Sequence, residues 1–329
     1  MTNSDLSTRP DRSTVLEAMA TAGRAPSVHN TQPWRWVLHG ADLRLYRDDS
    51  RLLEVADPAG RQLVISCGAM LHHVRTAFAA AGWHTDTLRV PDPKTPGWLA
   101  TVEFRPWPEP PPGVLARAAA IARRRTDRLP MREPEHWDEL LARLRMLVGH
   151  LEVGVDVLDD AARPRLAAAS EHSAATQRYD MQYQSELHWW TAHSMPKEGI
   201  PREALASDSE AERTPISRAF PTVEHAPRHG DIEDRSRLLV LSTDADSVLD
   251  WLRVGEALSV VLLECTASGA DTCALTHLTE LPAARRVLST MLSRPGVPQV
   301  VIRIGAENTG LDARMTPRRP VAEYLSVAD

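Results

Sequence analysis

The sequence has few cysteines and no long apolar run, and these absences exclude several classes of protein. Among its 329 residues there are three cysteines. They have neither an even count nor a C-x-x-C spacing, so free thiols are expected rather than disulfides. No window approaches the roughly 18 consecutive apolar residues that a membrane span requires. Residues 1–12 are polar and lack the apolar core of a signal peptide. We therefore expect a cytoplasmic protein with no membrane partner.

Familiar catalytic and metal-binding signatures are also missing. The sequence contains no H-E-x-x-H, G-x-S-x-G or Walker A motif, and no G-x-G-x-x-G follows an expected strand. His72 and His73 are adjacent on an expected helix and so face different directions. Pro227 breaks any helix that would align His225 with His229. The net charge of −6 argues against a nucleic-acid partner. We expect neither a metal site nor a hydrolase.

Apolar periodicity predicts helices and strands in a globular chain of ordinary composition, with 43% hydrophobic and 25% charged residues. Long helices are expected over 62–83, 161–190 and 245–268, and strands over 34–38, 43–46, 100–104, 151–158, 238–241 and 299–304. The proline-rich stretch 106–113 reads as a semi-rigid connector, which divides the chain into halves 1–107 and 108–329. Residues 191–235 are polar and broken by prolines, which is typical of a functional lid or of disorder.

The stretch over residues 24–36 reads R-A-P-S-V-H-N-T-Q-P-W-R-W and links an apolar helix to a strand. Pro26 and Pro33 stiffen its two ends. Ser27, Asn30 and Gln32 supply hydrogen-bonding groups on fairly short side chains. Ordinary turn chemistry is one explanation for this composition. The other is a loop that presents donors and acceptors to a bound group.

Two arginine motifs lie in the second half. Residues 123–128 (R-R-R-T-D-R) end an expected helix, where a solvated basic patch would be electrostatically favourable. A phosphate site is the sharper interpretation, because planar guanidinium groups bond phosphate bidentately and a hydroxyl can complete the set. Arg318 and Arg319 offer a second basic pair near the carboxyl end.

The order Ala-Pro-Ser-x-x-Asn-x-Gln-Pro-Trp resembles the flavin-contacting loop of the nitroreductase family. The chain most resembles the Acg branch of that family over nearly its whole length, with motifs at 24–36, 57–68, 123–128 and 298–321. A typical subunit carries its arginine motif before the loop, whereas here the loop lies in the first half and both arginine motifs lie in the second. The resemblance implies an α+β, nitroreductase-like fold of two fused, degenerate, pseudo-dimeric halves. Each half would have a mostly antiparallel sheet flanked by helices, and the pair would share one complete site.

The resemblance also implies which residues bind FMN. The loop would contact the flavin, both arginine motifs would hold its phosphate, and a segment after the long second-half helix would lie near the ring atom N5. That segment departs from the glycine pair or Glu-Gly usual in the family, and a lone histidine there is more often structural. The implied binding residues are Pro26, Ser27, Asn30, Gln32, Arg124, Arg125, Thr126, Arg128, Thr276, His277, Leu278, Arg318 and Arg319.

Three functions follow as hypotheses. The first is an FMN-dependent oxidoreductase in which NAD(P)H delivers hydride to flavin N5 and a small-molecule acceptor then takes the electrons in a ping-pong cycle. Such chemistry needs no dedicated catalytic side chain. The second is an FMN-sequestering protein whose lid over 191–235 prevents nicotinamide turnover. The third is a structural or regulatory module that has lost the flavin. A monomeric pseudo-dimer and a homodimer are both compatible with the sequence.

Overall fold

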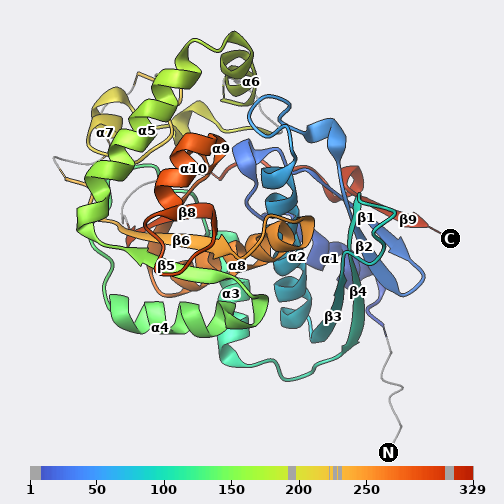
Figure 1. Ribbon diagram of the computed structural model, residues 1–329. Helices are drawn as coiled ribbons and strands as arrows, with labels where there is room; N and C mark the ends of the chain where they lie inside the picture. Colours follow the sequence, from blue (N-terminus) through green and yellow to red (C-terminus); the bar gives the residue numbers. More distant parts are fainter. Residues whose placement is uncertain are drawn as a thin grey trace, which may run out of the picture.

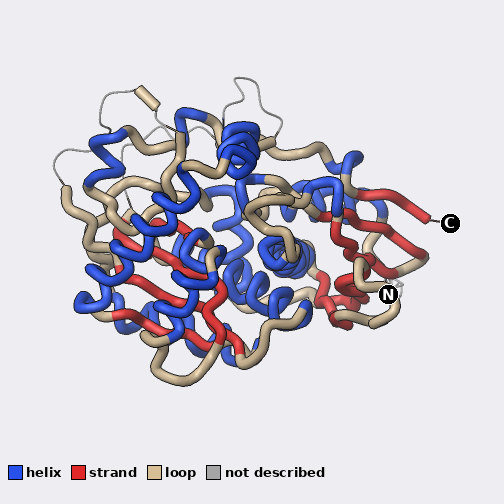
Figure 2. The backbone as a smooth tube through the Cα atoms, turned by 45° about the horizontal axis from the view of Figure 1, so that its top comes forward, coloured by secondary structure: helices blue, strands red, loops and turns tan. Residues whose placement is uncertain are grey.

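The computed structural model describes residues 9–191, 198–221, 223–224, 228, 232–307 and 315–328. It is an α+β fold with two separate sheets on either side of a central pair of helices (Figures 1 and 2). The first half contributes α1 (Arg12–Ala22), β1 (Trp34–His39), β2 (Asp42–Arg47), α2 (Arg61–Ala80), β3 (Trp83–Arg89) and β4 (Trp98–Pro106). The second contributes α3 (Pro112–Arg123), α4 (Trp137–Val148), β5 (Gly154–Leu158), α5 (Arg163–Arg178), α6 (Met181–Thr191), α7 (Asp208–Glu212), β6 (Arg237–Thr243), α8 (Val248–Ala267), β7 (Ala270–Leu275), α9 (His277–Glu280), α10 (Pro282–Ser289), β8 (Val297–Ala306) and β9 (Leu325–Ala328).

The two sheets have the same topology. One runs β3-β4-β2-β1-β9, and the other, in matching order, runs β7-β8-β6-β5. Every neighbouring pair is antiparallel except β1 with β9. Even the register irregularity recurs, between Leu45 and Tyr46 in β2 and between Leu241 and Ser242 in β6. The expected pair of pseudo-dimeric halves with mostly antiparallel sheets is therefore confirmed.

The equivalent helices α2 and α8 pack directly against each other at the centre of the molecule (Figure 1). Both contain 20 residues, so each position of α2 matches the one 187 residues later in α8, from Arg61 with Val248 to Ala80 with Ala267. Gly68 and Gly255 are the matching eighth residues and lie at the contact. A Cβ atom on Gly68 would lie 2.1 Å from the Leu252 carbonyl oxygen, and one on Gly255 would lie 2.0 Å from the Ile65 oxygen. Only glycine permits this separation of the two backbones.

The helix α2 is long and apolar enough to span a membrane, and it is the one such helix in the described part of the chain. Within the fold, 83% of its apolar window is buried. One apolar cluster packs α1 and α2 against the first sheet, and a second packs α4 and α8 against the other sheet. A third, beneath α5 and α10, covers that sheet's opposite face. Apolar residues of α2 therefore form part of the core at the place where the two halves meet.

The carboxyl-terminal strand returns to the first half. β9 pairs in parallel with β1, with Trp36 opposite Leu325. Nearby, the hydroxyl of Tyr324 donates to the Met19 carbonyl oxygen at 2.8 Å. The sequence did not indicate this strand, which has four residues. The boundary between the two halves, at residues 107 and 108, stays a prediction. Residues 325–328, although they come from the end of the chain, pair with the first sheet.

The close helix contact predicts a sharp stability difference between glycines. Gly255→Ala should lower the free energy of unfolding by at least about 2 kcal/mol, because its methyl group would collide with backbone atoms that cannot rotate away. Gly149→Ala is the matched control, since it has right-handed helical backbone angles and no heavy atom within 4 Å of the new methyl. It should be neutral or slightly stabilising. Chemical denaturation of both variants measures this, and equal midpoints would contradict the packing described.

Candidate functional site

A cavity of about 390 Å³ lies between the two halves. This volume is within the range typical of small-ligand sites. Its walls come from the first loop, the amino-terminal part of α2, the middle of α8, the strand β7 with the residues after it, and the segment 200–220. The lining includes Pro26, Ser27, Val28, His29, Gln62, Ile65, Ser66, Thr126, Arg128, Ser170, Arg218, Phe220, Leu258, Leu262, Thr272, Thr276 and His277.

The loop at one side of this cavity is held in an unusual backbone conformation. His29, Asn30 and Gln32 have φ values of 47°, 59° and 51°. For residues other than glycine, such angles persist only where the surroundings enforce them. The Ser66 hydroxyl accepts from the backbone N–H of Val28 at 3.1 Å, and the Ser27 hydroxyl accepts from that of Gln32 at 2.9 Å. The loop is thus anchored from α2 and from within.

The four loop residues singled out from the sequence divide into two groups. Pro26 and Ser27 line the cavity. Asn30 instead donates to the carbonyl oxygens of Gly199 at 2.9 Å and Pro317 at 3.1 Å. The Gln32 side-chain oxygen accepts from the backbone N–H of Arg319 at 2.9 Å. Asn30 and Gln32 therefore tie the loop to later parts of the chain.

Beside the loop, two arginines from distant parts of the chain converge on the backbone carbonyl group of a third, Arg24. Arg318 donates to the carbonyl oxygen of Arg24 at 3.1 Å, and Arg124 donates to the same oxygen at 3.5 Å. Arg124 is only 6% exposed. The Nε atoms of all three, and Nη1 of Arg124, are buried without a hydrogen-bond partner. Within the described part of the chain, none of the three forms an ion pair.

The electrostatics of this arginine cluster (Arg24, Arg124 and Arg318) are those of an anion-binding site. Burial and the neighbouring guanidinium groups lower the pKa of Arg124 to about 10 and that of Arg318 to about 9, and burial lowers the pKa of Arg24 as well. Buried donors without acceptors are costly, and buried like charges repel one another. An oxyanion would accept hydrogen bonds from these donors and would also offset the positive charges.

The other predicted arginines serve different contacts. Arg125 forms an ion pair with Asp271 at 2.9 Å. The guanidinium of Arg319 donates to the carbonyl oxygens of Gln32 and Glu323 at 2.9 and 2.8 Å. Arg128 lines the cavity, donates to the Ala204 carbonyl oxygen at 3.2 Å and lies 5.2 Å from the Phe220 ring centroid. Arg124 and Arg318 therefore lie together with Arg24, whereas Arg125 and Arg319 contact protein groups elsewhere.

The segment after β7 supplies another wall. Thr276 and His277 line the cavity, whereas Leu278 is buried in the third apolar cluster. His277 Nε2 lies 2.8 Å from the Ser170 hydroxyl, and burial, with Arg218 nearby, lowers the pKa of His277 to about 3. The imidazole is therefore neutral at physiological pH.

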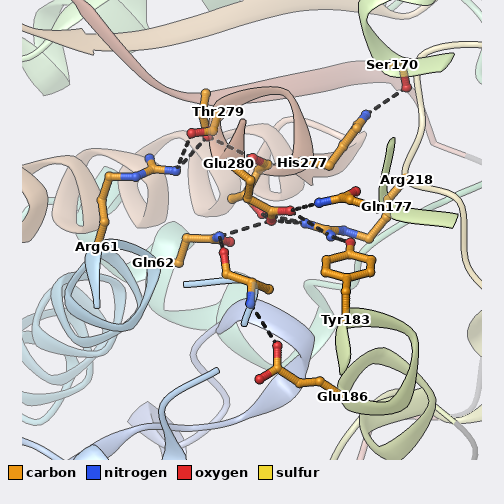
Figure 3. Close-up of polar contacts among 12 residues, drawn as sticks. Arg61, Gln62, Ser170, Gln177, Tyr183, Glu186, Arg218, His277, Thr279 and Glu280 are labelled. Atoms are coloured by element: carbon orange, nitrogen blue, oxygen red, sulfur yellow. Dashed lines mark hydrogen bonds and ion pairs between the residues drawn. The ribbon is translucent and has the colours of Figure 1, made fainter. Parts of the chain in front are cut away.

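Behind this wall lies a buried ionic network that the sequence did not reveal (Figure 3). Arg218 forms an ion pair with Glu280 and donates to the Tyr183 hydroxyl at 2.5 Å. Gln62 donates to the same carboxylate at 3.0 Å. Burial would raise the pKa of Glu280, but Arg218 holds it at about 2, and Glu280 in turn raises the pKa of Arg218. The pair is a fixed, internally neutralised unit beside the cavity.

The described part of the expected lid lies across the cavity. The carbonyl oxygen of Ser217 accepts from the Ser170 hydroxyl at 2.8 Å, and Phe220 meets the His29 ring edge-on at 6.0 Å. Residues 192–197, 222, 225–227 and 229–231 lie outside the described residues, and with them His225, Pro227 and His229. The segment 198–221, called here the cover segment, contributes Arg218 to the cavity wall.

The equivalent place in the other half is filled. The match between α2 and α8, with its offset of 187 residues, continues into the strands that follow them. Leu262 and Thr276, which line the cavity, therefore correspond to Arg75 and Arg89. These two arginines bind the fully buried Glu256, with Arg75 Nη1 at 2.8 Å and Arg89 Nε at 2.6 Å from its carboxylate. The cavity beside Arg75 measures about 180 Å³. The pseudo-symmetry thus leaves one open site and one occupied by an ion cluster.

The described residues contain no group of three or more His, Cys, Asp or Glu side chains able to hold a metal ion. All three cysteines are buried free thiols, and burial raises the pKa of each. Arg24, Gln62, Arg218 and Glu280 are the site residues that sequence reasoning missed. Arg24 stands within the predicted loop stretch, whereas nothing in the sequence connects Arg218 with Glu280.

Comparison with known proteins gives the family. No family model matches the chain. The sequence is 42% identical over 315 residues to the Mycobacterium tuberculosis protein named "Putative NAD(P)H nitroreductase acg", covering 95% of each chain. It is 35% identical over 324 residues to a second protein of that organism named "Putative NAD(P)H nitroreductase Rv3131", covering 96% of this chain and 92% of the other.

A solved structure, the FMN-dependent nitroreductase NfnB from Mycobacterium smegmatis in complex with NADPH, aligns with a TM-score of 0.42 at 18% identity. The alignment covers 65% of this chain and 99% of that one. The family assignment comes from the sequence relatives, which match this chain along nearly its entire length. This chain belongs to the Acg branch of the nitroreductase family.

Proposed function

We propose that this protein is an FMN-binding oxidoreductase that passes electrons from a reduced nicotinamide to a small-molecule acceptor. The observation that carries the proposal is the arginine cluster, in which each of three guanidinium groups has at least one buried donor atom without an acceptor and no acidic partner among the described residues. A phosphate dianion matches this deficit in charge and in hydrogen-bond acceptors. The relatives named NAD(P)H nitroreductases support the same class of reaction.

The residues present fit FMN in two parts. Arg24, Arg124 and Arg318 would hold the phosphate. The adjacent cavity, with its apolar walls of Ile65, Leu258 and Leu262, would take the ring. Pro26 and Ser27 line the cavity and lie two and three residues after Arg24, so the loop connects the two parts. Arg125 and Arg319, which have protein partners, are left out of this assignment.

When bound, FMN supplies reversible two-electron chemistry, accepting hydride at N5 from a nicotinamide and releasing electrons to an acceptor in a ping-pong cycle. The protein's own part is binding, orientation and exclusion of water. His29 and His277 are kept neutral, mainly by burial, which lowers the pKa of each to about 3. Two arginines of the lining, Arg218 and Arg303, already have carboxylate partners in Glu280 and Asp234. These two pairs are therefore committed to each other, as expected where the cofactor performs the chemistry.

A second candidate function is FMN sequestration, and the cover segment favours it. Residues 198–221 are held over the cavity at both ends, through Asn30 with Gly199 and through Arg218 with Glu280. A cover held closed by a buried ion pair would keep a nicotinamide from the ring. The two candidates predict the same yellow holoprotein and differ in whether a nicotinamide reduces it.

The arginine cluster predicts a phosphate-specific binding defect. Arg124→Ala and Arg318→Ala should each weaken FMN binding by about 2–3 kcal/mol, the scale for hydrogen bonds to charged groups. Riboflavin, which lacks the phosphate, should bind all forms equally. Quenching of flavin fluorescence measures both ligands, with Arg105→Ala, an exposed arginine on β4, as the control. Unchanged FMN affinity in both cluster variants would refute the assignment.

The filled equivalent site predicts the stoichiometry. Each chain should bind one FMN, because Arg75, Arg89 and Glu256 fill the second position. Spectrophotometric titration of the purified chain against FMN measures the end point. An end point of two per chain would show that the ion cluster does not close that site.

The cover segment predicts how turnover is controlled. In anaerobic mixing with NADH or NADPH, bleaching of the flavin absorbance by the wild-type chain supports the oxidoreductase, and its absence supports sequestration. The double variant Arg218→Met, Glu280→Gln removes the ion pair without leaving a buried lone charge. If the cover limits access, this variant should bleach at least tenfold faster. Equal rates in both forms, with FMN retained, would remove the cover from the mechanism.

A further inference from the structure

One buried histidine next to the arginine cluster has no role in the function proposed so far. His73 lies on α2, seven residues and therefore two helical turns beyond the cavity-lining Ser66, on the same face. It is 0% exposed. The helices α1 and α3, whose carboxyl ends lead to Arg24 and Arg124, both pack against α2. The helices that lead to Arg24 and Arg124 are therefore both neighbours of the helix that carries His73.

The hydrogen bonds of His73 determine which ring nitrogen carries its proton. Nδ1 lies 3.0 Å from the carbonyl oxygen of Ala69, and a carbonyl oxygen can only accept. Nδ1 is therefore the protonated nitrogen of the neutral ring. Ser259, 2.8 Å from Nδ1, is then free to donate its own hydrogen to His72 Nδ1 at 2.7 Å. This leaves Nε2 as a lone-pair acceptor, and it is buried without a partner.

The charges around the ring come from the same cluster. Burial is the main reason that the pKa of His73 falls to about 3, and the guanidinium groups of Arg124, Arg318 and Arg24 lower it further. His72, the adjacent titratable group, also has its pKa lowered by burial and is neutral. Among the described residues, no carboxylate contributes to this shift. Without a bound anion, the imidazole of His73 is neutral. Its unpartnered Nε2 belongs to a region with an excess of positive charge.

We propose that His73 is a fourth, proton-dependent ligand of the phosphate held by Arg24, Arg124 and Arg318, and that its Nε2 takes up a proton from solvent as the phosphate binds. The inference rests on the proposed function, since the phosphate is that of FMN. A lone pair would repel a phosphate oxygen, whereas a protonated Nε2 donates to it. The dianion also offsets the guanidinium charges, which lower the pKa of the buried ring further. No covalent bond forms or breaks.

Proton uptake gives this role a signature that a structural histidine would lack. At pH 7.5 the phosphate of free FMN is largely dianionic, since its second pKa is about 6. The free ring is neutral at that pH. FMN binding should therefore consume close to one proton, and riboflavin binding should consume none. Above the pKa of the bound ring, FMN affinity should fall about tenfold per pH unit, as linkage requires for one proton.

The experiment is calorimetric titration with FMN and with riboflavin in two buffers of different ionisation enthalpy, from pH 6.5 to 9. His73→Gln is the matched variant, because its amide can donate to phosphate without a proton from solvent. It should bind FMN with no proton uptake and with an affinity that does not change with pH. His73→Leu should lose at least tenfold in FMN affinity at pH 7 and keep its riboflavin affinity.

Wild-type behaviour alone decides the inference if a variant fails to fold. FMN binding without proton uptake, or equal uptake with riboflavin, overturns the role of His73 and leaves the proposed function intact. Equal pH profiles for the wild type and His73→Gln overturn it as well. Failure of the wild type to bind either flavin overturns the proposed function, and this inference with it.

Discussion

The direct contact between α2 and α8 at Gly68 and Gly255 is the constraint on which the rest of the structure depends. Two backbones that meet with no side chain between them fix the distance and the angle between the halves. Each helix then carries its own sheet on its outer side (Figure 2). The binding cavity is a consequence of this geometry, because its walls include residues of α2 that precede Gly68 and residues of α8 that follow Gly255. The site therefore belongs to the pair of halves and to neither alone.

Such an arrangement would place a second site at the equivalent position of the other half, but the side chains there are different. Where the open cavity has Leu262 and Thr276, the matching positions hold Arg75 and Arg89, and Glu256 is buried between them. Two guanidinium groups on one carboxylate satisfy its hydrogen bonds and stabilise a charge that would otherwise be costly to bury. Symmetry of the backbone thus coexists with asymmetry of function. The fused chain can change one site while preserving the other, which two identical subunits cannot do.

The retained site is electrostatically divided. At the cavity, Arg218 is paired with Glu280, and His29 and His277 are neutral. In the arginine cluster, charges are left unpaired at an energetic cost. Local strain is concentrated here too, in the three left-handed residues of the loop. Departures from the rules of a stable interior are expected at functional sites, and the strained loop and the arginine cluster are both next to the cavity-lining Pro26 and Ser27 in the chain.

Much of the fold could be predicted from the sequence. Apolar periodicity and proline positions are local properties, and they predicted the long helices and most strands. A run of specific residues, Pro26 to Trp34, identified the family and with it two of the three clustered arginines, Arg124 and Arg318. In the sequence, both arginine motifs lie in the second half and the loop lies in the first. This separation predicted one site shared by the two halves.

What only the tertiary structure decided is which side chains meet. Adjacent arginines look alike in sequence, yet Arg124 joins the cluster and Arg125 pairs with Asp271, because neighbours in a chain can point to different surroundings. Arg218 and Glu280 come from elements far apart in sequence. Their contact depends on how helices and sheets pack. The charge state of each group follows from that packing, because burial and nearby charges set its pKa. Neither the burial of a group nor the charges near it can be read from the order of residues.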